Sequence, residues 1–296
     1  MRSVRDAGAS DRMDKLKYKN MTKKSLLLIA GICLALFAVA QKKSKDGAKV
    51  NWKKVNVLVY IKNGKGYVHE NRAAGVAAIK QLGAQYGFSV TASENPADFT
   101  ENNLKKYNLV VFNNTNNDVF DTDEQKVAFM RYVQAGGGFV GIHSATGTER
   151  QWPWFKRLIG ASFLRHAKHQ PFKEIIIDAD HPSTSFLPKV WQRDDECYFF
   201  KEYNPDIRVL IVHDLGPLND KDKPTYYGGT SSPSAWCHEF DGGRQWYTSL
   251  GHDIATYAAP EFQKHIMGGI IWVIGNNKPL DYSKARATSP ADPLPY

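Results

Sequence analysis

The stretch GGGFVGIHSATG, residues 136–147, decides the fold of this chain. A helical pattern ends in its three glycines, and a short apolar strand follows at residues 139–142. His143 comes directly after that strand. In open α/β sheets, ligands bind in the crevice beyond the carboxyl ends of the strands. An imidazole there can exchange protons or bind a metal, although it can also simply cap the strand through one hydrogen bond.

The segments before this stretch alternate strands with helices. Continuous apolar runs predict strands at residues 55–61, 88–92 and 109–112, and apolar spacing predicts a helix over residues 69–82. Thr122-Asp-Glu-Gln125 is a capping-box signature, which predicts a helix from there to about Ala135. This alternation is typical of a mostly parallel sheet with helices on both faces. We therefore predict an α/β fold with a doubly wound sheet.

The second half of the chain is richer in loops. Strands are predicted at residues 175–177, 209–212, 235–240 and 245–249, and a tight hairpin turn at 241–244 joins the last two. A helix is predicted over residues 260–274, with a loosely held tail after it. One domain over residues 55–276 suits this pattern better than two, with a linker at 41–54 and a C-terminal tail at 277–296.

The N-terminal region predicts export. Residues 21–40 read as a signal peptide, with Lys23 and Lys24 before an apolar stretch that ends in Ala38-Val39-Ala40. A transmembrane anchor is the rival interpretation of this short stretch, but we expect no stable membrane span after cleavage and a periplasmic or secreted protein. Residues 1–20 form an uncertain extension, either disordered or an upstream translation artefact.

Composition narrows the class of partner. The chain has 296 residues, 42% of them hydrophobic, and a formal charge of +9. Residues 1–40 hold 8 basic and 3 acidic residues, so the rest carries only +4. Without a basic run interleaved with aromatics, nucleic acid is not expected as a partner. Two cysteines would remain after cleavage, Cys197 and Cys237, and we expect them to be unpaired because both lie in apolar segments. The oligomeric state stays open.

Four histidines are candidates for the chemistry. His69 follows the first strand, so it lies at the same sheet edge as His143. His238 and His252 flank the predicted hairpin. Such histidines could bind a divalent metal such as zinc, although they lack close ligand spacing and each could be an ordinary core or helix-end residue.

Glu196 and several aromatic residues complete the candidate site. Glu196 precedes an apolar aromatic segment, and burial there would raise its pKa toward the range useful for acid/base catalysis. Aromatic faces suit sugar rings as well as protein cores. We take four aromatic side chains as candidate saccharide-binding residues: Trp152, Trp191, Trp236 and Tyr227.

Seven short motifs, taken in their order along the chain, resemble those of a known protein family. They begin at Gly137, Trp152, Asp180, Asp195, Ala235, Asp241 and Leu250, and read GGFVGIH, WPW, DHP, DE, AWCHE, DGGR and LGH. Together they resemble the trehalose-utilisation (ThuA-like) family, and the likeness covers residues 55–276.

The resemblance implies a flavodoxin-like sheet, similar to that of class I glutamine amidotransferases. Those enzymes carry a nucleophilic cysteine where this chain has His143, and an imidazole cannot replace that thiolate, so amidotransferase activity is not expected. By the family pattern, the site residues would be His143, Glu196, His238 and His252, with His69 next.

The same resemblance implies a role in disaccharide use. It favours an enzyme that acts on a glycoside or 3-keto-glycoside by acid/base chemistry, as a hydrolase, lyase or isomerase. The alternative is a non-catalytic carbohydrate-binding protein on a degenerate amidotransferase-like fold. In either case we expect one site built from both halves of the chain. His143 and His252 should then lie within about 10 Å of each other, with Glu196 mostly buried beside them.

Overall fold

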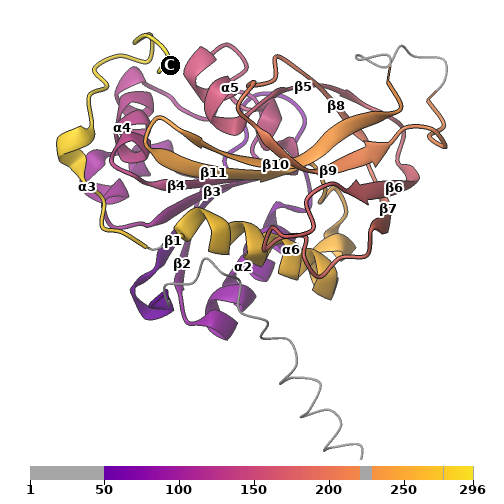
Figure 1. The fold of residues 1–296 in the computed structure, drawn as a ribbon. Helices are drawn as coiled ribbons and strands as arrows, with labels where there is room; N and C mark the ends of the chain where they lie inside the picture. Colours follow the sequence, from indigo (N-terminus) through magenta and orange to yellow (C-terminus); the bar gives the residue numbers. More distant parts are fainter. Residues whose placement is uncertain (1–49, 221–228, 276, 296) are drawn as a thin grey trace, which may run out of the picture. The chain divides into compact units, whose positions relative to one another are not determined.

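The computed structural model describes residues 50–220, 229–275 and 277–295. Their main element is a nine-stranded sheet with the order β2-β1-β3-β4-β11-β10-β9-β6-β7 (Figure 1). The first five of these strands run parallel, and each later strand is antiparallel to its neighbour. The strands are β1 (Asn56–Tyr60), β2 (Ser89–Ser93), β3 (Leu109–Asn113), β4 (Gly138–Ile142), β6 (Gln170–Ile176), β7 (Val190–Asp195), β9 (Arg208–Asp214), β10 (Ser231–Phe240) and β11 (Gly243–Thr248).

Helices cover both faces of this sheet, as the alternation of elements predicts. Helices α2 (Arg72–Tyr86) and α6 (Pro260–Ile274) pack on one face, and α4 (Asp123–Gln134) and α5 (Pro153–Ile159) on the other (Figure 1). Strands β3 and β4 are buried along their whole length, which explains their continuous apolar sequences. The α/β prediction is therefore confirmed.

The glycine-rich stretch acts as expected. Helix α4 begins with the predicted capping box at Thr122 and Gln125. Gly136 follows the helix with φ +96°, a conformation that L side chains rarely adopt. A Cβ atom on Gly137 would lie 2.4 Å from the ring of Tyr132, so only glycine fits there. The chain can therefore turn directly from α4 into β4, which ends one residue before His143.

The hairpin between β10 and β11 also forms as predicted. Its two turn residues, Asp241 and Gly242, have φ values of +48° and +97°, as a two-residue type I′ turn requires. Two strands were not predicted, β7 and β5 (Ser162–His166). The aromatic segment after Glu196 forms β8 (Tyr198–Lys201), which pairs with β5 in an antiparallel arrangement. A short helix, α3 (Glu101–Leu104), is also present.

The C-terminal segment is held more firmly than its composition suggests. The backbone N–H groups of Arg286 and Ala287 donate to the side-chain oxygen of Gln134, at 2.7 and 2.9 Å. The indole of Trp152 donates to the carbonyl of Pro290 at 3.0 Å. The expected loose tail instead docks against α4 and α5, because its polar backbone meets side chains that satisfy it.

The predicted signal peptide at residues 21–40 and the extension before it fall outside the described residues. Among the described residues, no helix is long and apolar enough to span a membrane.

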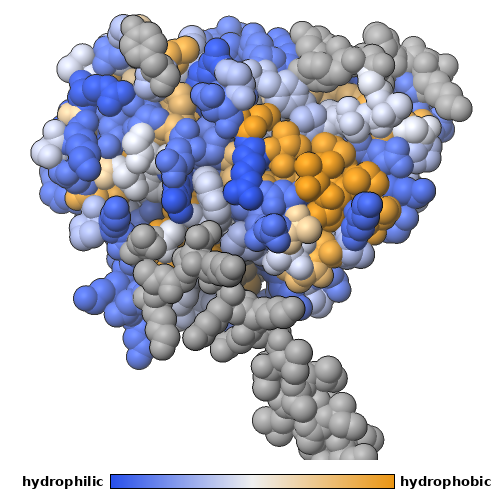
Figure 2. Space-filling model, viewed as in Figure 1, coloured by the Kyte–Doolittle hydropathy of each residue, from blue (hydrophilic) through white to orange (hydrophobic). Residues whose placement is uncertain are grey.

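Figure 2 shows apolar side chains gathered on the face near β6 and β7, where Ile177 and Val190 are exposed. Since β7 is the last strand of the sheet, this apolar surface lies at an open edge.

Candidate functional site

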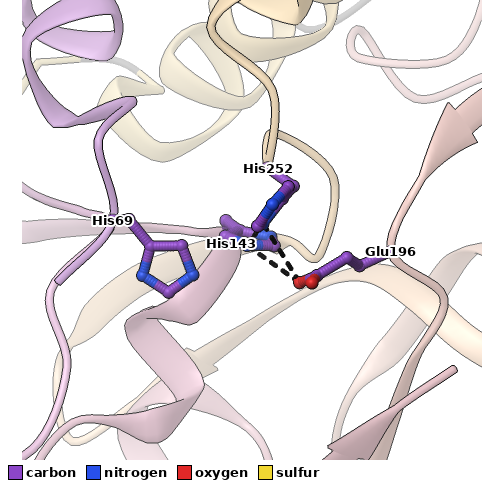
Figure 3. Close-up of side chains that lie close together, drawn as sticks. All are labelled: His69, His143, Glu196 and His252. Atoms are coloured by element: carbon purple, nitrogen blue, oxygen red, sulfur yellow. Dashed lines mark hydrogen bonds and ion pairs between the residues drawn. The ribbon is translucent and has the colours of Figure 1, made fainter. Parts of the chain in front are cut away.

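Four predicted side chains meet at one edge of the sheet. His69 follows β1 through a loop, His143 follows β4, Glu196 follows β7 and His252 follows β11. These four strands run in the same direction, so their carboxyl ends lie at the same edge. One ligand atom from each residue lies within 4.8 Å of the others (Figure 3). We refer to these four residues as the His/Glu cluster.

Glu196 joins two of the histidines. Its Oε2 atom lies 3.1 Å from Nδ1 of His252 and 3.6 Å from Nε2 of His143. Those two nitrogens are 3.4 Å apart. The ring of His69 completes the group, with its centroid 4.9 Å from that of His143 and 5.7 Å from that of His252. The cluster is therefore compact enough for its members to act on one small group.

His143 has its tautomer fixed by its neighbours. Its Nδ1 lies 2.7 Å from the carbonyl oxygen of Ser249, which can only accept, so Nδ1 carries the proton. The lone pair of Nε2 then faces the cluster and accepts from the hydroxyl of Tyr198 at 2.8 Å. Burial holds the pKa of His143 well below its usual value, so the ring is neutral. His143 also has φ +53°, a strained conformation typical of functional turns.

The loop that carries His252 is fixed from two sides. The carboxylate of Asp195 accepts from the backbone N–H groups of Gly251 and His252, at 2.9 and 3.1 Å. The side-chain amide of Asn71 donates to the carbonyl oxygens of the same two residues, at 2.5 and 2.7 Å. Because Asp195 ends β7 and directly precedes Glu196, these bonds bring the far edge of the sheet to the cluster.

The charges of the cluster differ from our expectation at one point. Burial alone would raise the pKa of Glu196, but its hydrogen bond to His252 and the charges of nearby histidines bring that pKa below its ordinary value. The predicted rise is therefore wrong, and Glu196 is a carboxylate. The bond to Glu196 raises the pKa of His252 in turn. Burial lowers the pKa of His69 to about 4, so that ring is neutral.

The cluster opens on a cavity of about 590 Å³. His69, Glu196 and His252 line it, whereas His143 lies behind them and is fully buried. The wall also carries side chains that sequence reasoning did not single out. They include two arginines, one further histidine and three aromatic residues: Arg150, Arg165, His166, Tyr67, Phe163 and Tyr198.

The geometry confirms much of the predicted arrangement. His143 and His252 meet, and Glu196 is 8% exposed beside them. One detail is wrong: β1 and β4 are not neighbours, because β3 lies between them. The side chain of His69 still reaches the cluster, since it extends from a loop of eight residues after β1 rather than from the strand end itself.

His238 does not belong to the cluster. It lies within β10, where its ring contacts the side chains of Asn204 and Gln245 and the carbonyl of Arg157, at 3.3, 2.8 and 3.1 Å. The predicted shared site is therefore wrong for this residue. Its place inside a strand, rather than after one, keeps it away from the edge where the other four side chains gather.

The predicted saccharide-binding aromatics lie in the protein core. Trp152, Trp191 and Trp236 are 4%, 6% and 0% exposed, and none lines the cavity at the His/Glu cluster, so, contrary to expectation, they cannot contact a substrate held there. They pack between helices and sheet because indoles bury large apolar areas. Trp152 lines a separate pocket near Pro290. Tyr227 lies outside the described residues. Cys197 and Cys237 are buried and free, as expected.

Some site residues could have been found from the sequence. Tyr67 stands two positions before His69, and Tyr198 stands two positions after Glu196. In an extended segment, residues two apart project to the same side, so each tyrosine was a natural companion of its predicted neighbour. His166 and Arg150 gave no such signal, because His166 ends β5, a strand that was not predicted, and Arg150 lies in a turn without a pattern of its own.

Comparison with known proteins agrees with this fold. The model of the ThuA family, described as trehalose utilisation, matches residues 56–273. The chain belongs to the ThuA family. The ThuA assignment agrees with the amidotransferase-like sheet expected from the resemblance. Among curated proteins, none matches the chain.

Two solved structures of ThuA-like proteins are similar to the chain. One, from Bacteroides uniformis, is 23% identical and has a TM-score of 0.64, with 82% of this chain and 98% of that chain covered. Another, from Parabacteroides merdae, is 20% identical and has a TM-score of 0.60, with 74% of this chain and 89% of that chain covered. At these identities the likeness shows the ThuA fold.

Proposed function

We propose that this ThuA protein is an enzyme that acts on a saccharide or a 3-keto-glycoside by acid/base chemistry at the His/Glu cluster. The observation that carries the proposal is a carboxylate and two imidazoles at the wall of a cavity of about 590 Å³, with a third imidazole, that of His143, in contact behind them. The family's description as trehalose utilisation supports a saccharide as the substrate class.

The charge states give the residues different roles. His252, whose pKa is raised, is the proton donor, and the carboxylate of Glu196 or the neutral ring of His69 is the proton acceptor. A ketone acidifies the adjacent C–H bond, so the acceptor removes that proton while His252 protonates the departing glycosidic oxygen. His143 lies behind them and orients the cluster rather than contacting the sugar.

The same four side chains suit a divalent cation such as zinc. His143 presents an unprotonated Nε2, and Nδ1 of His69 is buried with no hydrogen-bond partner among the described residues. Three imidazoles and one carboxylate form a ligand set typical of zinc and other first-row metals. A bound cation would polarise a sugar carbonyl.

The test uses purified protein and a panel of saccharides and 3-keto-glycosides, including 3-keto-trehalose. We expect turnover of a keto-glycoside, and a loss of at least about a hundredfold in kcat for His252→Gln, as removal of a positioned acid or base causes. His238→Gln is the control, since it removes an imidazole that lies within β10 and does not line the cavity. Binding of saccharide without product would favour the non-catalytic alternative, and neither binding nor turnover would refute both.

The metal is tested separately. Elemental analysis of protein purified without a histidine tag should give about one zinc or similar ion per chain, lost in His143→Gln. A content well below one, unchanged after incubation with zinc, would contradict a metal role while leaving acid/base catalysis open.

Export is the remaining part of the proposal, and residues 21–40 support it. Expression of the full chain in a bacterial host, followed by fractionation and N-terminal sequencing, should yield a periplasmic protein that begins near Gln41. A full-length protein retained in the membrane would favour an anchor instead.

A further inference from the structure

A buried ion pair lies behind the His/Glu cluster and is not part of it. Glu174 on β6 and His213 on β9 are both fully buried, with Oε1 and Nδ1 3.1 Å apart. The second oxygen of Glu174 has no hydrogen-bond partner among the described residues. Burying such charges is costly, and a well-packed apolar pair of similar volume would often be as stable or more stable. The fold alone therefore gives no reason for these two residues.

The pair connects to His143 through two serines. Ser234 on β10 donates to Oε1 of Glu174 at 2.7 Å, and its hydroxyl lies 3.0 Å from that of Ser249. Nε2 of His213 lies 3.5 Å from the same Ser249 hydroxyl. The backbone carbonyl of Ser249 accepts the Nδ1 proton of His143. A change in the charge or position of Glu174 can thus move Ser249 and alter the hydrogen bond that its carbonyl accepts from His143.

The pair also touches the segment that carries Glu196. Cys197, the next residue in the chain, is fully buried and interacts electrostatically with the ring of His213. Burial would lower the pKa of His213, but Cys197 and Glu174 together raise it well above its usual value. Both chain segments that bring Glu196 and His252 to the cavity, at residues 196–198 and 249–252, are therefore anchored near one buried pair.

We propose that Glu174 and His213 are positioning residues, which hold the Ser249 carbonyl so that His143 keeps its Nδ1–H tautomer and its Nε2 lone pair faces the cluster. The inference rests on the His/Glu cluster being the functional site of the proposed enzyme. Partners that orient an imidazole through its second nitrogen commonly change metal affinity or activity by about ten- to a hundredfold when they are removed.

The test is Glu174→Gln, which keeps the volume and removes the charge. The first measurement is side-chain nitrogen NMR of histidine in the metal-free protein at neutral pH, with the His143 signal assigned by its loss in His143→Gln. We expect a single Nδ1–H tautomer in the wild type and a mixture of tautomers in the variant. The second is titration with cobalt(II), followed by its visible absorption, where we expect affinity to fall at least about tenfold.

His238→Gln is the control for simple loss of stability, because it removes a buried, hydrogen-bonded imidazole from the same sheet. It should lower the melting temperature and leave both the His143 tautomer and cobalt affinity unchanged. If Glu174→Gln does not fold, Ser234→Ala replaces it, since that change breaks the same connection without leaving a new buried charge.

A folded Glu174→Gln or Ser234→Ala variant with the wild-type tautomer of His143 would overturn the proposal. If the wild type itself binds no cobalt, the metal role of the cluster fails, and the tautomer measurement alone decides the positioning role. If no substrate is turned over, the proposed enzyme fails in the same way without affecting the NMR result.

Discussion

If the proposed function holds, Tyr67 is the residue best placed to contact a sugar ring. It is 63% exposed at the cavity wall, and its ring meets that of His69 edge-on at 4.8 Å. An aromatic face with this exposure offers an apolar surface to the C–H groups of a sugar. The indoles of Trp152, Trp191 and Trp236 offer no such exposed face, because they are buried. The sequence could not show this, since residue type alone does not distinguish a core aromatic side chain from an exposed one.

The substitution Tyr67→Ala should therefore raise KM about tenfold with little change in kcat, since it removes contact area and no reacting group. Tyr67→Phe should be close to wild type. Tyr86→Ala is a suitable control, because that tyrosine is exposed but packs on Trp52, outside the residues that line the cavity. An unchanged KM in Tyr67→Ala, measured by steady-state kinetics or calorimetry, would show that the sugar binds elsewhere.

The pair Glu196 and His252 gives a prediction for pH. In the metal-free protein, with Glu196 as the proton acceptor of the proposed reaction, catalysis needs Glu196 charged and His252 protonated. The lowered pKa of Glu196 and the raised pKa of His252 then widen the active range on both sides. The rate should fall in acid as Glu196 gains a proton, and in alkali as pH rises through the pKa of His252. In His252→Gln the alkaline decline of kcat should vanish, and its persistence would assign that limb to another group.

At the scale of elements, the junction between β7 and β8 holds the site together. Asp195 accepts three backbone N–H groups, from Glu196, Gly251 and His252. It is fully buried, so a lost acceptor cannot be replaced by water.

We expect Asp195→Asn to lower the free energy of unfolding by about 1–3 kcal/mol, because an amide accepts more weakly and adds a donor facing other donors. Activity should fall with it, since both Glu196 and His252 lose their anchor. The neighbour Asp194, whose side chain is 66% exposed, provides the control: Asp194→Asn should change neither quantity. Urea denaturation and kcat of the two variants check this, and equal stability of both would contradict the anchoring role.

The elements also show where sequence reasoning succeeded. Strands β1, β3 and β4 are continuous apolar runs between helices with clear caps, so local signals were sufficient. Strand β7, with the sequence VWQRDD, is a polar edge strand with alternating burial, and β5 and β8 pair only with each other. The aromatic residues of β8 do indicate a strand, but the formation of β5 and β7 depends on distant partners, which no local pattern reveals. Glu196 was predicted correctly even though the strand that leads to it was not.

For the molecule as a whole, buried histidines set its response to acid. Burial lowers the pKa of His69, His238 and His265 to about 4 and of His181 to about 3, while the unfolded chain keeps values near 6.5. Between these limits the unfolded state binds more protons than the folded state. The contribution of these neutral rings to stability is therefore complete above about pH 6.5 and is lost as pH falls toward 4.

The expected loss is up to about 1.4 kcal/mol per pH unit for each such histidine. Denaturation in urea at pH values between 7.5 and 4.5 measures it directly. His265→Gln removes one of these groups, which does not line the cavity. It should reduce the slope of the free energy of unfolding against pH by the contribution of up to one proton. A free energy of unfolding that does not change with pH over this range would refute the assignment of neutral, buried rings.

The members of the His/Glu cluster are contributed by segments that span residues 69 to 252, from loops after four different strands. No single hairpin or helix contains two of them. A growing chain thus gains the whole site only when β11 has joined β4. Any cation or sugar that this cluster binds must then stabilise the folded protein and cannot assist the earlier steps of folding. Such a ligand should slow unfolding and leave the rate of refolding unchanged.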